Sequence, residues 1–274
     1  MKRFHLIGCV AIVLCFLLPA AGECAQNPDE GYTPQIGQEG KDVIWLPTSQ
    51  ELADTMLDMA KVTFSDHVID LGSGDGRLVI AAAKRGAMAL GIEYNPQLVE
   101  FSRHAAAREG VSARARFEEG DIFKSDFSKA TVLTLFLEDS LNLKLRPKIL
   151  DMKPGTRVVS NTFTMADWEP DQTVKTPLTH PVSKKTGLFS TFLWIVPAKV
   201  HGIWKLDNGR INFTQNFQKV TGTLTIEGKD TKLTGGLNGA TVTFTAGDTE
   251  YTGTVNGSTI SGTRTDGGSW KAVR

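Results

Sequence analysis

A loop with three closely spaced glycines is the part of the sequence best suited to binding a ligand. Gly72, Gly74 and Gly76 lie between an apolar run that predicts a strand and an alanine-rich run that predicts a helix. Glycines allow a tight turn and a close approach between the backbone and a ligand. The start of the following helix offers free N–H groups. A glycine loop of this kind is shared with dinucleotide-binding enzymes, so the loop alone predicts only a nucleotide-like ligand.

Three acidic residues around the loop narrow the class of ligand. Asp70 ends the first predicted strand, just before the loop, where it would sit well against an ammonium group. Glu93 follows Gly76 by seventeen residues and ends the next predicted strand, where an acid can accept both hydroxyls of a ribose. Asp121 follows the third predicted strand, where it could meet the amino group of an adenine. A nucleotide with an amino-acid tail needs all three acids.

Alternating strands and helices must position these residues. Apolar runs predict strands at residues 68–71, 87–93, 114–118, 131–137, 157–162 and 188–196, with a further strand near 173–178. Helical patterns occur at residues 49–61, 78–85, 96–110 and 143–152. Repeated β-α units predict an α/β fold, with a mostly parallel, Rossmann-like sheet covered by helices on both faces.

Local signals mark the starts of three of these helices. Thr48 and Glu51 match a capping box before the first helix. Asn95 and Pro96 match the N-cap and the first residue of the third helix. Pro147 must kink the fourth helix or shift its start.

The composition changes abruptly near Val200. The 74 residues from His201 to Arg274 contain 15 Thr and 13 Gly, and no stretch of them predicts a helix. Alternating runs at residues 210–217, 221–227, 241–245, 250–255 and 259–265 are separated by turns, two of which contain Asn-Gly, a strong hairpin signal. Residues 200–274 therefore predict a second, antiparallel meander or barrel-like domain, with Trp204 and Trp270 closing its core. This domain could engage an envelope partner.

Composition and charge exclude several classes of protein. The 30 basic and 30 acidic residues leave no net charge, so a broad nucleic-acid-binding surface has no support. Three cysteines exclude a disulfide scaffold and a cysteine-based zinc module. His67, His104 and His180 have no metal-ligand spacing, so we expect no metal site.

The first 25 residues predict a secretory signal peptide. A basic start is followed by an apolar run at residues 6–18 and then by a proline and small residues. We therefore expect a periplasmic or secreted protein, with a retained membrane anchor as the alternative. Residues 26–44 are polar and rich in Gly, Pro and Gln, which predicts an extended lead-in to the first domain.

The glycine loop and its acids resemble a known enzyme class. The segment from Asp70 to Gly76 resembles the first motif of class I S-adenosylmethionine-dependent methyltransferases, and Glu93 and Asp121 resemble the acids of the second and third motifs. The Lys153-Pro154-Gly155 turn before the fifth predicted strand is also typical. The resemblance covers about residues 40–198.

Within this class, the sequence is most similar to the small protein-lysine methyltransferases and their bacterial relatives. That subgroup includes the enzyme that acts on the c subunit of ATP synthase. The similarity rests on Asp-Leu-Gly-Ser-Gly-Asp-Gly-Arg at residues 70–77, on the alanine-rich helix that ends in Lys84-Arg85-Gly86, and on the Trp45-Leu46-Pro47-Thr48 segment. By analogy, this last segment would line the cofactor site.

The resemblance implies S-adenosylmethionine as cofactor and a methyltransferase domain at residues 45–199. The residues expected to bind the cofactor are Asp70, Gly72, Ser73, Gly74, Gly76, Glu93, Tyr94, Asp121 and Ile122. The Asn/Asp-Pro-Pro-aromatic segment that many amino-group methylating enzymes carry after the fourth strand is absent, because that position reads Leu-Glu-Asp-Ser-Leu-Asn at residues 137–142. Glu138 or Asp139 is the candidate to orient or deprotonate an amine, with Asn142 as a further candidate.

The methyl acceptor stays open at this point, since it can be a protein, including a protein lysine, or a small molecule. Two other functions compete with methyl transfer. One is an exported module that binds S-adenosylmethionine or another nucleoside without turnover, and the weaker one is a nicotinamide-dependent oxidoreductase. A cofactor that is made in the cytoplasm also conflicts with the predicted export.

Overall fold

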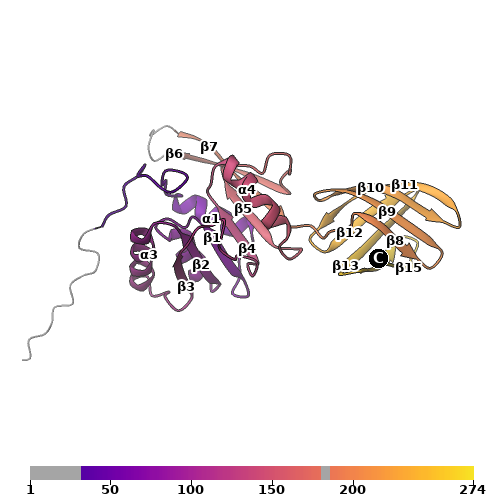
Figure 1. Ribbon diagram of the computed structural model, residues 1–274, viewed down its shortest axis with the longest axis horizontal. Helices are drawn as coiled ribbons and strands as arrows, with labels where there is room; N and C mark the ends of the chain where they lie inside the picture. The colour runs from indigo at the N-terminus through magenta and orange to yellow at the C-terminus, as the bar shows by residue number, and fades with distance from the viewer. Residues whose placement is uncertain (1–31, 180–185) are drawn as a thin grey trace, which may run out of the picture.

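The computed structural model describes residues 32–179 and 186–274, arranged as an α/β unit followed by a β-barrel (Figure 1). The predicted signal peptide, the first part of the lead-in and His180 lie outside the described residues. Within the described ranges, no helix combines the length and the apolar character that a membrane crossing requires.

Seven strands form the first sheet, in the order β3-β2-β1-β4-β5-β7-β6. They are β1 (His67–Leu71), β2 (Met88–Glu93), β3 (Ala115–Glu119), β4 (Val132–Leu135), β5 (Arg157–Asn161), β6 (Gln172–Thr179) and β7 (Thr186–Ile195). The first five are parallel, whereas β7 runs antiparallel to both β5 and β6. The chain order reverses between β1 and β4, and the carboxyl ends at such a reversal form the ligand-binding crevice of open α/β sheets.

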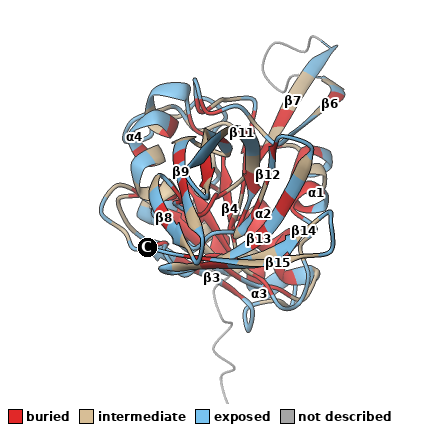
Figure 2. Cartoon of the chain, turned by 90° about the vertical axis from the view of Figure 1, so that its right-hand side faces the viewer, coloured by how far each residue is buried: buried red, intermediate tan, exposed pale blue. Residues whose placement is uncertain are grey.

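Helices cover both faces of this sheet, as predicted. They are α1 (Gln50–Met59), α2 (Arg77–Lys84), α3 (Pro96–Arg108) and α4 (Asp139–Leu150). The first three pack on one face, and α4 packs on the other together with the loops that follow β3 and β5. Figure 2 shows the buried positions gathered on the strands, with exposed positions on the outer sides of the helices. The predicted α/β fold with a following all-β domain is confirmed.

The starts of two helices differ from the prediction. Ser49, not Thr48, caps α1, because its Oγ accepts a hydrogen bond from the Leu52 amide at 3.2 Å. The capping box with Thr48 is therefore wrong by one residue. The predicted start of α4 at residue 143 is also wrong, since the helix begins at Asp139 and accommodates Pro147 in its interior. The N-cap prediction for α3 is confirmed, because Asn95 accepts from the Gln97 amide at 2.9 Å.

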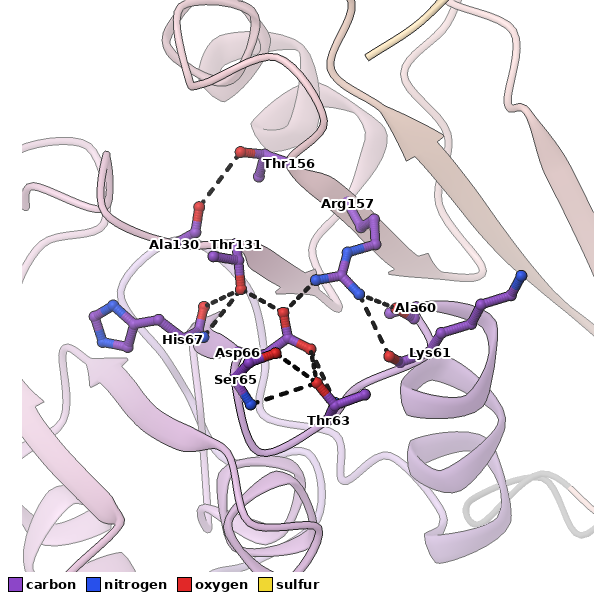
Figure 3. A network of polar contacts seen from close by, with 10 residues as sticks. All are labelled: Ala60, Lys61, Thr63, Ser65, Asp66, His67, Ala130, Thr131, Thr156 and Arg157. Carbon is purple, nitrogen blue, oxygen red and sulfur yellow. Dashed lines mark hydrogen bonds and ion pairs between the residues drawn. The ribbon is translucent and has the colours of Figure 1, made fainter. Parts of the chain in front are cut away.

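A polar network ties together the amino-terminal ends of the strands, at the edge opposite the crevice (Figure 3). Asp66 accepts hydrogen bonds from the Thr131 hydroxyl at 2.7 Å, from the Thr63 amide at 2.8 Å and from the Arg157 guanidinium. Arg157 also donates to the carbonyl of Ala60, just after α1. Burial disfavours the ionised carboxylate, but these hydrogen bonds hold the pKa of Asp66 below its ordinary value.

The second domain is a closed barrel in the order β10-β11-β12-β13-β14-β15-β8-β9. Its strands are β8 (Gly202–Leu206), β9 (Gly209–Asn216), β10 (Lys219–Ile226), β11 (Lys229–Asn238), β12 (Thr241–Ala246), β13 (Thr249–Asn256), β14 (Thr259–Arg264) and β15 (Ser269–Val273). Three of them, β8, β11 and β15, have no counterpart among the predicted runs. In β11 the alternation is interrupted by Gly235, where a Cβ would lie 2.6 Å from the Cβ of Phe244.

Aromatic side chains fill the barrel and its junction with the sheet. Trp204 is completely buried, whereas Trp270 is half-buried at the rim of the same core. At the junction, the buried Trp168 stacks on Phe217 with 5.8 Å between ring centroids. The Ala198 amide also donates to the carbonyl of Gly239 at 2.8 Å, which connects the linker to the barrel.

Candidate active site

A cleft opens at the carboxyl ends of β1, β2 and β4 and encloses about 990 Å³ of space, open solvent included. Eight of the nine residues predicted to bind the cofactor line it, namely Asp70, Gly72, Ser73, Gly74, Glu93, Tyr94, Asp121 and Ile122. Gly76 does not line it. The Trp45-Leu46-Pro47-Thr48 segment also lines the cleft, as the resemblance to the protein-lysine methyltransferases implies.

The glycine loop takes a shape that other residues would strain. Gly72, Gly74 and Gly76 have φ values of +77°, +54° and +78°. A Cβ on Gly74 would lie 2.4 Å from Nε1 of Trp45, so this glycine lets the indole close over the loop. A Cβ on Gly76 would lie 2.6 Å from the ring of Phe117, so this glycine lets α2 start close to the sheet.

Glu93 connects the glycine loop to the end of β2. One carboxylate oxygen accepts from the Gly74 amide at 2.9 Å, and the other accepts from the Asn95 amide at 2.9 Å. These bonds fix the orientation of the carboxylate. Each oxygen keeps further acceptor capacity, which suits the paired hydroxyls of a ribose.

Asp70 is a buried carboxylate at the bottom of the cleft. The Thr134 hydroxyl donates to its Oδ1 at 2.7 Å. The pKa of Asp70 is raised to about 7, mainly by burial and in addition by the nearby acids Glu93 and Asp75, although the hydrogen bond from Thr134 opposes this shift. A cation bound here would stabilise the ionised form, so the site fits a ligand with an ammonium group.

A short loop of the lead-in forms the roof of the cleft and brings in Lys41. The loop is closed by hydrogen bonds from the Gly37 amide to the Trp45 carbonyl and from the Trp45 amide to the Gln38 carbonyl, each 2.9 Å long. The ammonium of Lys41 lies 3.7 Å from Asp121. A hydrogen bond from the Phe123 amide and the charge of Lys41 hold the pKa of Asp121 below its ordinary value. Sequence reasoning missed Lys41, because an isolated lysine in a polar segment carries no signal.

The two predicted catalytic acids lie beside the cleft and do not line it. Asp139 accepts hydrogen bonds from the Thr164 amide at 2.6 Å and from its hydroxyl at 3.0 Å. Asn142 is buried and donates to the Thr164 carbonyl at 3.2 Å. Glu138 precedes α4 and makes no capping hydrogen bond through its side chain. These contacts hold the loop after β5 against α4, and a catalytic role for the two acids stays a prediction.

Comparisons with known proteins identify the family. The protein-family model described as the ANTKMT methyltransferase domain matches residues 70–172 of this chain. A protein-lysine N-methyltransferase of Saccharolobus islandicus (strain REY15A) is 40% identical over 136 residues, which is 48% of this chain and 84% of that protein. The human lysine N-methyltransferase for the c subunit of ATP synthase is 42% identical over 105 residues, which is 38% of this chain and 45% of that protein. The chain thus spans less than half the length of the human relative.

One similar solved structure carries a product of the cofactor. The RNA methyltransferase from Salinibacter ruber in complex with S-adenosyl-L-homocysteine is 41% identical, with a TM-score of 0.51 over 57% of this chain and 96% of that one. These similarities support an S-adenosylmethionine-dependent enzyme, and none supports a binding module without turnover. The chain belongs to the S-adenosylmethionine-dependent methyltransferases, in the group that includes these protein-lysine N-methyltransferases.

Proposed function

We propose that this methyltransferase acts on the side-chain amine of a protein lysine. The observation that carries the proposal is the 40% identity to a protein-lysine N-methyltransferase over 84% of that protein. The segment that the family model matches, residues 70–172, contains Asp70, Glu93 and Asp121, which line the cleft.

When bound, S-adenosylmethionine supplies a methyl group that is already activated by its positively charged sulfur. The chain therefore has to hold the two reactants in line and exclude water. All three acids line the cleft, and in this proposal Glu93 accepts the ribose hydroxyls, Asp121 accepts the adenine amino group and Asp70 pairs with the ammonium. Ile122 and Leu137 offer apolar walls for the flat base. Residues 39–48 form the roof over the cleft.

RNA is the competing acceptor class, because the similar Salinibacter ruber structure is described as an RNA methyltransferase. The equal numbers of basic and acidic residues weigh against RNA. Binding to a polyanion depends mainly on clustered lysine and arginine charges that neutralise phosphates.

The test is a transfer assay with a labelled methyl group on the full chain, using lysine-containing proteins and total RNA as acceptors. We expect label in protein, at a lysine identified by mass spectrometry. Glu93→Ala should abolish transfer, whereas the matched control Glu118→Ala, at an exposed position of β3, should not. Label in RNA alone would contradict the proposal.

We further propose that the protein is exported, and that its barrel domain meets a partner in the envelope. The support is the basic and apolar pattern of the first 25 residues, together with a compact barrel outside the cofactor cleft. Fractionation of cells that produce the full chain tests this directly. Recovery of the uncleaved chain from the cytoplasm alone would contradict export.

A further inference from the structure

A second, smaller cavity lies between α1 and the β5-β7-β6 end of the sheet and encloses about 370 Å³ of space, open solvent included. Its walls are mainly apolar and include Leu46, Pro47, Leu52, Phe136, Leu178 and Phe189. None of the residues that line it is charged. The cavity extends along the β6–β7 hairpin, which projects from the sheet beyond the rest of the α/β unit (Figure 1).

This cavity shares a wall with the cofactor cleft. Leu46, Pro47, Thr48 and Phe136 line both spaces. Phe136 directly follows β4, and its ring packs against Phe163 with 6.0 Å between centroids. The two spaces therefore meet at the roof segment and Phe136, so a group that enters along the hairpin ends at the edge of the cleft.

Asn161 provides a polar group in this apolar cavity. It is the last residue of β5, is 1% exposed and lines the cavity. Its Oδ1 accepts a hydrogen bond from the Thr162 hydroxyl at 2.9 Å. Within the described residues, its side chain makes no other hydrogen bond. The amide NH2 and the second acceptor site of Oδ1 therefore remain available to a ligand.

A strained turn holds Asn161 in place. Thr162 has a φ of +66°, which a β-branched residue rarely adopts. The Phe163 amide donates to the Asn161 carbonyl at 2.7 Å, and the Thr162 amide donates to the Ser190 carbonyl of β7 at 2.7 Å. The first of these bonds closes a three-residue turn of the rare, strained kind. Strain of this kind persists only where the surroundings impose it, and it is concentrated at functional sites.

An apolar channel with one amide suits an alkyl amine. The aliphatic stem of a lysine would lie along the apolar walls. An uncharged, buried environment lowers the pKa of an amine and favours the neutral form, which has the free lone pair that methyl transfer needs. The amide oxygen of Asn161 could accept one N–H and thereby orient that lone pair.

We propose that this cavity is the acceptor channel, which takes a lysine side chain, and that Asn161 is the residue that positions its nitrogen. This inference rests on the proposed function as a protein-lysine methyltransferase. The residues after β4 do not form an Asn/Asp-Pro-Pro-aromatic segment. In this proposal, the amide that faces the acceptor comes instead from Asn161 at the end of β5.

The experiment fills the channel without touching the cofactor cleft. Leu178→Trp places a bulky ring inside the cavity, and Leu188→Trp places the same ring at an exposed position of the same hairpin. We expect Leu178→Trp to lower kcat/KM for a lysine peptide by at least about tenfold, the factor that corresponds to 1.4 kcal/mol. S-adenosylmethionine binding by calorimetry should stay within about twofold in both variants, which also shows that they fold. Unchanged acceptor kinetics in Leu178→Trp would overturn the inference.

Two further arms separate the positioning role from the proposed function. Asn161→Ala should lower kcat by about tenfold, as expected for one lost hydrogen bond, with cofactor affinity retained. Asn161→Asp should move the pH optimum upward, because a carboxylate stabilises the ammonium form; an unshifted profile would argue against contact with the amine. If the wild-type chain methylates no lysine, the proposed function fails. Binding of n-butylamine to the wild-type chain would then still identify an amine channel, provided that Leu178→Trp abolishes the binding and Leu188→Trp retains it. If n-butylamine does not bind, the amine channel is refuted.

Discussion

Replacement of Asp70 by Asn is predicted to stabilise the fold and weaken the cofactor site. Asp70 is buried, and burial raises its pKa from 3.8 to about 7. An acid with a raised folded-state pKa contributes stability in its protonated form, and that stability is lost as the pH rises from the unfolded value through the folded one. The shift corresponds to about 4 kcal/mol of destabilisation once the group is ionised in the fold. Asn keeps the acceptor oxygen for the Thr134 hydroxyl and carries no charge.

The expected signature is a pH-dependent gap between the two proteins. From the linkage relation, the destabilising contribution of Asp70 is about 2 kcal/mol at pH 5 and about 4 kcal/mol at pH 8. The difference in free energy of unfolding between Asp70→Asn and the wild type should therefore increase in favour of the variant by about 2 to 3 kcal/mol from pH 5 to pH 8. Any change in packing contributes equally at both pH values and cancels.

Urea unfolding at pH 5 and pH 8 measures this gap. Asp70 lies in β1, and the apolar core of the sheet is separate from that of the barrel, so the transition that we expect to shift is that of the α/β sheet. Calorimetry at pH 8 should show weaker S-adenosylmethionine binding to the variant, because the partner of the ammonium is lost. A gap of the same size at both pH values would refute the reasoning, since it would mean that Asp70 does not titrate in this range.

Three other substitutions probe the glycine loop, the barrel and the opposite edge of the sheet. Gly74→Ala should displace Trp45 and reduce cofactor affinity at least about tenfold, whereas the control Gly257→Ala, with a similar φ of +57° and no atom near its Cβ, should leave calorimetric binding unchanged. Trp204→Ala should destabilise the barrel by about 3 to 5 kcal/mol in urea unfolding while cofactor binding persists; a parallel loss of binding would show that the two domains are coupled. Asp66→Asn should destabilise the sheet more at pH 7 than at pH 3, because the stability that comes from a lowered pKa is full above the unfolded value and is lost as the pH falls through the folded one. An equal loss at both pH values would point to lost hydrogen bonds rather than lost charge.

Short-range signals in the sequence were sufficient for the parallel sheet and for the outline of the cofactor cleft. The glycines of the loop and the Asn95 cap each act through the backbone within a few residues. Because carboxyl ends of parallel strands meet at one edge, an acid that ends a predicted strand can be assigned to the cleft without coordinates. Asp70, Glu93 and Asp121 are such acids, and all three line it.

Contacts between segments that lie far apart in the sequence determine the features that the sequence did not predict. Lys41 reaches Asp121 from the lead-in, Asp139 is held by Thr164, and Asn161 enters a cavity formed with α1 and the β6–β7 hairpin. In the barrel, Gly235 interrupts the alternating pattern of β11 because the backbone must approach Phe244 closely. Sequence periodicity reports which face of an element is buried, but it does not report which distant side chain that face meets. That pairing depends on how the elements pack, so only the tertiary structure determines the roof of the cleft and the acceptor channel.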